Sequence, residues 1–306
     1  MTRLRVWQVV AALLAAGIVS AVVRNQIKVY QGRQARVAAT ARQPAARLSR
    51  EQLLLQRRQT LFEMLQPVSV ANCRLERFGE SHDGGYLMCG NLLDEVAAGY
   101  SYGISGYDGW GCEVATRFAV PVHQYDCFNH TRPACATGDT RFHEECVGDH
   151  AFEADGRPFD TISNQIAKNG HRSRRVVLKM DVEGAEWDAL YFAPDKILER
   201  VDQMVVEFHL DQRADRLEIE KYVQVARRLA QFFHVVHIHY NNASCREGLE
   251  PFPAWAFEVL FVSKRLAVVD AGRAPPLPHP LDAPNMEGLE DCQAAPSART
   301  PAPSHP

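Results

Sequence analysis

Two carboxylates stand at the end of an apolar run, which is where α/β proteins hold their ligands. Asp181 and Glu183 directly follow the run Val176–Met180, and Gly184 leads into a helix-like segment. In an open α/β sheet, ligands bind beyond the carboxyl ends of the strands, so we predict that Asp181 belongs to a functional site. The alternative is an acidic loop before a helix, in which the helix dipole favours Glu186.

A glycine-rich turn followed by a distant carboxylate is the second chemical signal. The segment Gly99–Gly111 is typical of a strand, a close turn and a helix start, and Asp126 ends a later apolar run about 20 residues after Gly106. At that spacing, doubly wound nucleotide sites place a carboxylate on ribose hydroxyls. The glycine spacing is not the dinucleotide fingerprint, which disfavours an oxidoreductase. A solvated aspartate at a strand end is the alternative.

Paired histidines raise the question of a metal site. His237 and His239 lie two residues apart in an apolar run, so they would share one face of a strand. Together with Asp181, Glu207 and His209 they would supply ligands for a divalent metal ion, which makes a metal-dependent hydrolase a rival class. Alternating histidines are also a simple amphipathic pattern, and we therefore assign no metal ligands from the sequence.

The elements that must position these residues alternate between strands and helices. This alternation predicts an α/β fold with a mainly parallel sheet and right-handed crossovers. An amphipathic helix opens at Ser49 and stops at Pro67, and a tight turn at Asp83–Gly85 precedes a short strand. The other predicted strands are Val120–Asp126, Phe142–Val147, Val176–Met180, Gln203–His209, Val235–Asn242 and Ala256–Val262. The other predicted helices are Cys112–Phe118, Phe159–Ala167 and Ala214–Phe232.

Composition bounds the class of protein. The chain has 306 residues, of which 46% are hydrophobic and 23% charged, and these are ordinary values for one globular domain with appendages. The formal net charge of -3 argues against a nucleic-acid partner, which requires a basic face. Eight cysteines without a Cys-x-x-Cys pair disfavour zinc ribbons and thioredoxin-like sites. Their even number permits disulfides without demonstrating them.

The N-terminal segment is apolar and flanked by basic residues. Residues 6–23 are uncharged and rich in Val, Ala, Leu and Ile, and this length is near the lower limit of about 17–25 residues for a membrane-spanning helix. We predict a signal-anchor or transmembrane segment at 1–24 and a basic, Ala/Arg-rich stalk at 25–50. A cleaved signal peptide and an organelle transit peptide are the alternatives.

Two observations favour a single-pass membrane protein of the secretory pathway, with its domain in the Golgi or endoplasmic reticulum lumen. Asn129–Thr131 and Asn242–Ser244 fit the glycosylation acceptor pattern, and the cysteine count suits an oxidising lumen. Basic residues are denser after the apolar segment than before it, which by the positive-inside rule favours the opposite orientation. A secreted or organellar protein is the alternative.

The strongest motif resembles a known enzyme family. Leu178–Trp187, with the sequence LKMDVEGAEW, is similar to the signature of FkbM-type S-adenosylmethionine-dependent methyltransferases. Within this resemblance, the closer match is to the methyltransferase-like proteins of animals that carry a membrane-spanning or signal N-terminus. The likeness covers roughly residues 75–263 and continues at four further segments. These are Arg77–Gly79 with Asp83–Tyr86, Ser101–Ile104, Glu207–His209 and His239–Asn242.

The resemblance implies a class I methyltransferase, whose Rossmann-like fold has a seven-stranded mixed sheet with helices on both faces. In such a sheet the seventh strand runs antiparallel. The resemblance places the methyltransferase-like catalytic domain at 51–270. Beyond it, residues 271–306 are rich in Pro, Ala and Ser, and this composition predicts a disordered tail.

Residue roles follow from the resemblance by position. The cofactor would be S-adenosyl-L-methionine, with Gly103, Ser105 and Gly106 along its methionine and ribose part. Asp126 would hold the ribose hydroxyls and Asp149 would lie near the adenine. The glycine turn lacks the E/D-x-G-x-G pattern of many class I enzymes, which makes a non-catalytic methyltransferase-like binding module the alternative function.

The implied reaction transfers a methyl group to an O- or N-nucleophile of an unidentified acceptor. Alignment of nucleophile, methyl and sulfur supplies much of the acceleration, and a base near the strand ends removes the acceptor's proton. We predict Asp181, His209 and Glu207 as catalytic residues, with Asp181 also facing the cofactor. His209 or Asp181 would accept the proton, although a histidine held by backbone hydrogen bonds is the alternative for His209. The predicted partners are the acceptor and, through the N-terminal segment, a membrane.

Overall fold

The computed structural model describes residues 48–211 and 216–292. The predicted membrane segment at 1–24 and most of the stalk at 25–50 lie outside the described residues. Within them, no helix is both long and apolar enough to cross a membrane.

A seven-stranded sheet forms the centre of the domain, with strand order β11-β12-β10-β9-β3-β4-β5. In chain order its strands are β3 (Ala98–Tyr102), β4 (Val122–Tyr125), β5 (Thr140–His143), β9 (Val176–Met180), β10 (Val201–His209), β11 (Phe233–Tyr240) and β12 (Ala256–Ser263). From β5 to β10 every neighbouring pair is parallel, whereas β12 runs antiparallel to both β10 and β11. The predicted α/β fold with a mixed seven-stranded sheet is therefore confirmed.

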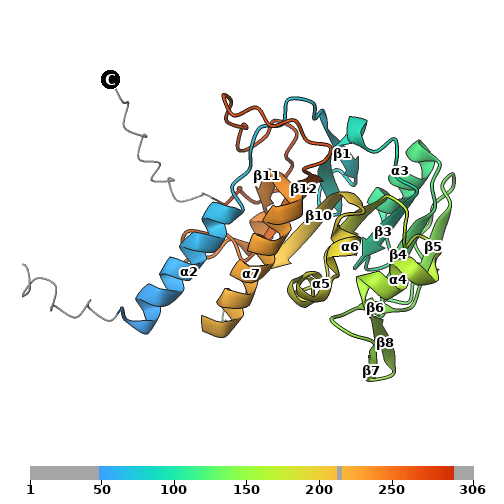
Figure 1. Ribbon diagram of the computed structural model, residues 1–306, viewed down its shortest axis with the longest axis horizontal. Coiled ribbons are helices and arrows are strands. Elements are labelled where there is room, and N and C mark those ends of the chain that lie inside the picture. The colour runs from blue at the N-terminus through green and yellow to red at the C-terminus, as the bar shows by residue number, and fades with distance from the viewer. Residues whose placement is uncertain (1–47, 212–215, 293–306) are drawn as a thin grey trace, which may run out of the picture. The chain divides into compact units, whose positions relative to one another are not determined.

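Alternation along the strands divides the core between the two faces of the sheet. In β9, Val176, Leu178 and Met180 belong to one apolar cluster, while Val177 belongs to the other, because successive side chains of a strand point to opposite faces. The helices that cover the first face are α2 (Arg50–Met64), α4 (Ile162–Lys168), α5 (Glu186–Phe192), α6 (Asp195–Leu198) and α7 (Arg216–Phe232) (Figure 1).

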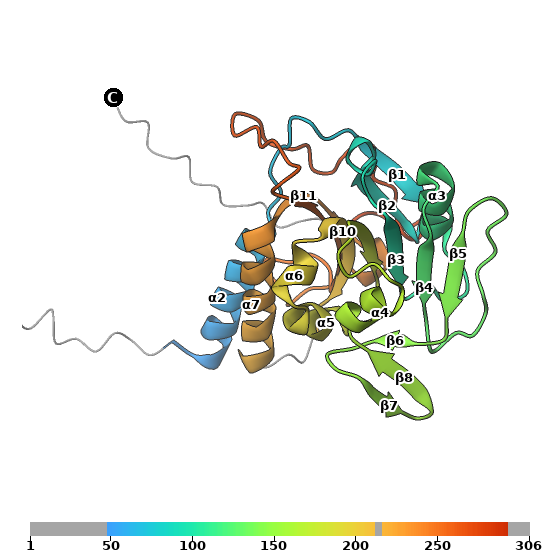
Figure 2. The same cartoon turned by 45° about the vertical axis from the view of Figure 1, so that its right-hand side comes forward.

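The second face is covered by helix α3 (Gly109–Phe118) and by the hairpin of β1 (Leu75–Gly79) and β2 (Gly85–Cys89) (Figure 2). The predicted turn at Asp83–Gly85 is this hairpin's turn, and Gly84 adopts a positive φ of 80° there. Trp110 and Val114 of α3 are fully buried against this face. Helices therefore lie on both faces of the sheet, as predicted.

The sequence prediction is wrong between β4 and α4. The predicted strand Phe142–Val147 is divided: β5 ends at His143, and β6 (Cys146–Val147) belongs to a separate small sheet with β7 (Phe152–Ala154) and β8 (Arg157–Asp160). The division occurs at Glu144 and Glu145, two charged residues that interrupt the apolar pattern. The predicted helix Phe159–Ala167 begins three residues later, at Ile162, because Thr161 caps it through the N–H of Asn164.

All eight cysteines form disulfides: Cys73–Cys89, Cys112–Cys135, Cys127–Cys146 and Cys245–Cys292. The last of these fastens the C-terminal segment to the domain, and the structure describes residues 271–292 of the predicted disordered tail. There Asp282 pairs with His237 at 2.8 Å, and the amide of Asn285 donates to Glu258. Prolines prevent regular structure in this segment, but the disulfide and the polar contacts hold it. Residues 293–306 lie outside the described residues.

Three histidines pack beside the tyrosines of β3 and β4. His123 is buried and stacks on Tyr100, with ring centroids 5.1 Å apart, and its Nδ1 lies 3.1 Å from Nε2 of His143. Nδ1 of His171 lies 2.8 Å from the hydroxyl of Tyr100. Burial lowers the pKa of His123 to about 3, and it also lowers the pKa values of His143 and His171.

This cluster predicts that the contribution of His123 to the stability of the domain is lost in mild acid. The unfolded state binds a proton at His123 near pH 6.5, whereas the folded state binds it only near pH 3. The contribution of the neutral His123 to the free energy of unfolding is therefore fully present above pH 6.5 and is lost as the pH falls below this value. The loss from His123 alone is at most about 1.4 kcal/mol per pH unit. Urea unfolding at pH 7, 6 and 5, with disulfides intact, measures it.

The variant His123→Phe keeps an aromatic ring and removes the titrating group, so its free energy of unfolding should rise relative to that of the wild type as the pH falls from 7 to 5. His130→Phe is the matched control, because His130 is exposed. Equal slopes for His123→Phe and the wild type would show that His123 does not carry the effect.

Candidate active site

The carboxyl ends of β3, β4, β9 and β10 bring most of the predicted residues together. Asp181 follows the last residue of β9, and its backbone N–H donates to the carbonyl of Tyr102, the last residue of β3. Gly103 therefore lies directly beside Asp181. His209 ends β10, the strand that pairs with β9 on the other side. The parallel pairing of β3 with β9 therefore places the glycine turn and Asp181 at the same edge of the sheet.

The turn after β3 requires glycine at its first position. Gly103 has a positive φ of 72°, and a Cβ atom there would lie 1.6 Å from the carbonyl oxygen of Asp181. Ser105 and Gly106 also have positive φ values, of 45° and 86°. This backbone therefore turns sharply over the end of β9, and only a residue without a side chain fits at Gly103.

Asp126 orders the two loops around this turn. Its Oδ2 accepts hydrogen bonds from the N–H groups of Ile104 and Ser105 at 3.2 and 2.8 Å. Its Oδ1 accepts from Phe128 and Asn129 at 2.8 and 2.9 Å. Asp126 is 9% exposed. The carboxylate therefore joins the loop after β3 to the loop after β4, and backbone donors engage both of its oxygens.

A cavity of about 350 Å³ opens at this edge of the sheet. Its volume is within the range of about 300–1,000 Å³ that is usual for small-molecule sites. The lining combines acids, aromatic rings and small residues: Tyr102, Gly103, Ser105, Tyr125, Asp126, Phe128, Asn129, Cys146, Val147, Phe159, Asp181, Val182, Glu183 and Ala185. Of the predicted cofactor residues, Gly106 and Asp149 are outside this lining. Asp149 instead pairs with His150 at 2.7 Å.

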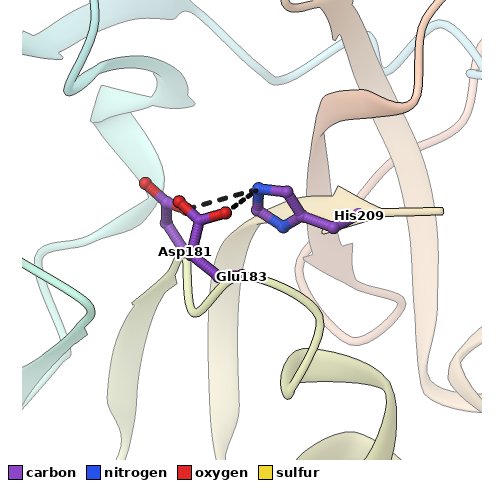
Figure 3. A group of neighbouring side chains, drawn as sticks. All are labelled: Asp181, Glu183 and His209. Atoms are coloured by element: carbon purple, nitrogen blue, oxygen red, sulfur yellow. Dashed lines mark ion pairs between the residues drawn. The ribbon is translucent and has the colours of Figure 1, made fainter. Parts of the chain in front are cut away.

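Asp181, Glu183 and His209 point toward one another (Figure 3), and the first two also line the cavity. Nε2 of His209 lies 3.5 Å from Oε2 of Glu183 and 3.9 Å from Oδ1 of Asp181. His209 is only 7% exposed, whereas the Glu183 side chain is 82% exposed. Glu183 has a positive φ of 55°, an unusual backbone conformation for a residue other than glycine.

Glu186 fixes the orientation of His209. This fully buried carboxylate accepts hydrogen bonds from the backbone N–H groups of His209 and Gly184, at 2.6 and 2.8 Å. Its Oε1 also lies 3.3 Å from Nδ1 of His209. The neighbouring Trp187 donates its indole N–H to the carbonyl of His209 at 2.8 Å. Glu186 is thus more than the helix cap considered from the sequence, since it ties the Asp181 loop to β10.

The other side of Asp181 faces Tyr86 and Lys179. The hydroxyl of the buried Tyr86 donates to Oδ2 of Asp181 at 3.4 Å, and Nζ of Lys179 lies 3.8 Å from the same oxygen. Lys179 also donates to the carbonyl of Gly103. Tyr86 and Lys179 therefore contact Oδ2, and Oδ1 is the oxygen that faces His209. A lysine inside the apolar run of β9 was the sequence signal for this contact, but its partner could not be read from the run.

Burial and neighbouring charges shift the proton equilibria of this group. Burial raises the pKa of Asp181, although Lys179 and His209 act in the opposite direction. Burial together with the Asp181 and Glu258 carboxylates raises the pKa of Glu207 well above its usual range. Burial lowers the pKa of His209, but its hydrogen bond to Glu186 and the nearby carboxylates outweigh this and raise it to about 9. With this pKa both ring nitrogens of His209 are protonated at neutral pH, so the ring is a hydrogen-bond donor and not a general base.

The paired histidines of β11 have other partners. His237 pairs with Asp282, and Nδ1 of His239 lies 3.5 Å from Glu258. Glu207 is buried and accepts a hydrogen bond from Asn241 at 2.9 Å. Among the described residues, the set whose ligand atoms approach closely enough for one metal ion is Asp181, Glu183 and His209. His237 and His239 are not part of it.

A second cavity of about 460 Å³ lies on the His209 side of the cluster. Its lining consists of Glu183, Gly184, His209, Leu210, Asp211, Glu218, Tyr222 and Trp255. Glu183 lines both cavities. The two cavities are therefore adjacent at the cluster of Asp181, Glu183 and His209. This arrangement suits a reaction between two bound molecules.

No family model matches the chain, and no curated protein matches it.

Proposed function

We propose that this protein is an S-adenosylmethionine-dependent methyltransferase of the class I fold that transfers a methyl group to an O- or N-nucleophile. The observation that carries the proposal is the cavity at the carboxyl ends of β3, β4 and β9, lined by Gly103, Ser105, Asp126 and Asp181. The strand order agrees with it, because β12 is the antiparallel strand expected from the resemblance and lies between β10 and β11.

The chemistry of the lining fits this cofactor. The turn at Gly103 lets the backbone approach a ligand closely, and Asp181 supplies negative charge for a sulfonium or an amino group. Phe128 and Phe159 supply flat apolar surface for an adenine ring. When bound, S-adenosylmethionine supplies a methyl group that moves to the acceptor atom while the carbon–sulfur bond breaks and its electron pair goes to sulfur.

The residues of the chain would then align the acceptor and receive its proton. We assign the second cavity to the acceptor, because it meets the first cavity at Glu183. Oδ1 of Asp181 faces the junction while Tyr86 and Lys179 hold Oδ2, so Asp181 is the proton acceptor that the geometry favours. His209 would orient the acceptor by donating a hydrogen bond.

A non-catalytic binding module is the second candidate, and one observation favours it. Backbone N–H groups engage both oxygens of Asp126, so ribose hydroxyls would have to compete for this carboxylate. A module of this kind would keep the fold and the second cavity without the methyl donor.

Four disulfides support the proposed compartment. Such bonds persist in oxidising environments and are rare in the cytosol. We propose that the domain lies in the secretory-pathway lumen or outside the cell, held to a membrane through the N-terminal segment.

The variant Asp181→Asn tests the proposed role directly. The full chain with labelled S-adenosylmethionine should label an acceptor in fractionated secretory-pathway extracts. We expect Asp181→Asn to reduce this transfer by a factor of about 10²–10⁴, measured with S-adenosylmethionine at saturating concentration. Asp155→Asn is the control, because Asp155 is exposed in a hairpin turn. Transfer by Asp181→Asn at the wild-type rate would refute the role.

A further inference from the structure

We propose that Asp181, Glu183 and His209 form a binding site for one divalent first-row transition-metal cation, such as Mn²⁺, between the two cavities. The binding site follows from the geometry of the chain alone. Its role in holding an acceptor oxygen rests on the proposed function.

The ligand atoms are already close to metal-binding distances from one another. Nε2 of His209 lies 3.5 Å from Oε2 of Glu183 and 3.9 Å from Oδ1 of Asp181, and all three atoms lie within 4.8 Å. Ligands about 2.1 Å from a metal ion and at right angles to tetrahedral angles lie about 3.0–3.4 Å apart. Small side-chain rotations would therefore suffice to complete the site.

His209 is oriented as a metal ligand, provided that the cation displaces the proton that Nε2 holds in the metal-free chain. It is buried, its Nδ1 faces the Glu186 carboxylate, and its Nε2 points toward the two acids in Figure 3. Among the described residues, Nε2 has these carboxylates as ion-pair neighbours and no shorter hydrogen bond. Metal-binding histidines commonly donate their other ring N–H to a carboxylate in this way, which fixes the ring and its tautomer.

The surrounding charge also favours a cation. The carboxylates of Asp181, Glu183 and Glu186 lie 3.3–3.9 Å from the ring nitrogens of His209. Nζ of Lys179 lies 3.8 Å from Oδ2 of Asp181, the oxygen that does not face His209. A divalent cation would balance this excess of negative charge at the junction of the cavities.

The kinds of ligand restrict the choice of metal. All eight cysteines are in disulfides, so no thiolate is available for a soft metal ion. One imidazole nitrogen with two carboxylate oxygens suits borderline and hard divalent cations, of which Mn²⁺ is an example. Three protein ligands leave coordination positions open, as in catalytic metal sites.

The open positions suggest which acceptors the site would take. Glu183 lines both cavities, so a cation bound to it lies between the proposed cofactor and acceptor chambers. In the metal-bound state the cation, rather than an Nε2 hydrogen of His209, would hold the acceptor hydroxyl at this junction. We therefore infer that acceptors carry a hydroxyl group able to bind a divalent cation.

Calorimetric titration of MnCl₂ into the chelator-stripped full chain tests the site, without S-adenosylmethionine present. We expect one Mn²⁺ per chain. Glu183→Gln should weaken binding about 10–100-fold, and it should fold because Glu183 is exposed. Glu153→Gln is the matched control, since it removes the same charge from an exposed strand outside both cavities.

Stoichiometric binding that is lost in Glu183→Gln and kept in Glu153→Gln supports the site. Absence of saturable binding, or equal weakening in both variants, overturns it. A separate titration of the same metal-free chain with S-adenosylmethionine distinguishes the two proposals. Cofactor binding without Mn²⁺ binding refutes the metal site alone, whereas Mn²⁺ binding without cofactor binding refutes the proposed methyl donor alone.

Discussion

Replacing Gly103 with alanine is expected to abolish binding of S-adenosylmethionine and to destabilise the domain. The new Cβ would lie 1.6 Å from the carbonyl oxygen of Asp181, so the turn after β3 and the Asp181 loop must move apart. The positive φ of 72° adds conformational strain. We expect a loss of about 3 kcal/mol or more in the free energy of unfolding, measured in urea.

Gly170→Ala is the matched control for this variant. Gly170 also has a positive φ, of 82°, but a Cβ atom there meets nothing within 4 Å and the residue does not line the cavity. It should cost about 1–2 kcal/mol from backbone strain alone and leave cofactor binding unchanged. Wild-type cofactor affinity in Gly103→Ala would contradict the proposed approach of the ligand to this turn.

Replacing Asp126 with alanine is expected to have the second large effect. The change leaves the N–H groups of Ile104, Ser105, Phe128 and Asn129 without their acceptor. A hydrogen bond to a charged group contributes about 1.5–3 kcal/mol, so even partial replacement by water leaves a loss of about 3–6 kcal/mol. Urea unfolding measures this loss, and calorimetry should show that cofactor binding disappears with it.

Asp160→Ala separates loss of stability from loss of the site. Asp160 also ends a strand and is buried, where it accepts hydrogen bonds from Thr161 and Asn164 and pairs with Lys168. It does not line the cavity. We therefore expect Asp160→Ala to be destabilised but to bind S-adenosylmethionine. Loss of binding in both variants would mean that binding reports stability only.

The elements of the sheet could be predicted because their residues repeat local patterns. Val176–Met180 is an uninterrupted buried run, and α7 has an apolar stripe at helical spacing, so both were placed within a few residues. The strand end that carries Asp181 followed from the same pattern. The confirmed alternation of strands and helices then brought Gly103, Asp126 and Asp181 to one edge.

Contacts between distant segments could not be read from the sequence. Tyr86 lies 95 residues from Asp181, and its hydroxyl reaches Oδ2 only because the hairpin folds over the sheet. Glu186 resembled a helix cap because its bonds to β10 depend on strand pairing. The tail was predicted to be disordered because composition does not reveal that Cys292 pairs with Cys245.

The possible metal ligands could likewise not be identified from the sequence alone. Alternation correctly placed His237 and His239 in one strand, but not their partners, which are Asp282 and Glu258. The set that converges is Asp181, Glu183 and His209, because β9 and β10 are parallel neighbours.

Calorimetric titration of S-adenosylmethionine into the chain with its disulfides formed measures whether the cavity beyond β3, β4 and β9 binds the proposed methyl donor. We expect saturable binding of one molecule per chain, absent in Gly103→Ala and preserved in Gly170→Ala. Absence of binding to the folded wild-type chain, or equal binding by Gly103→Ala, would contradict this expectation.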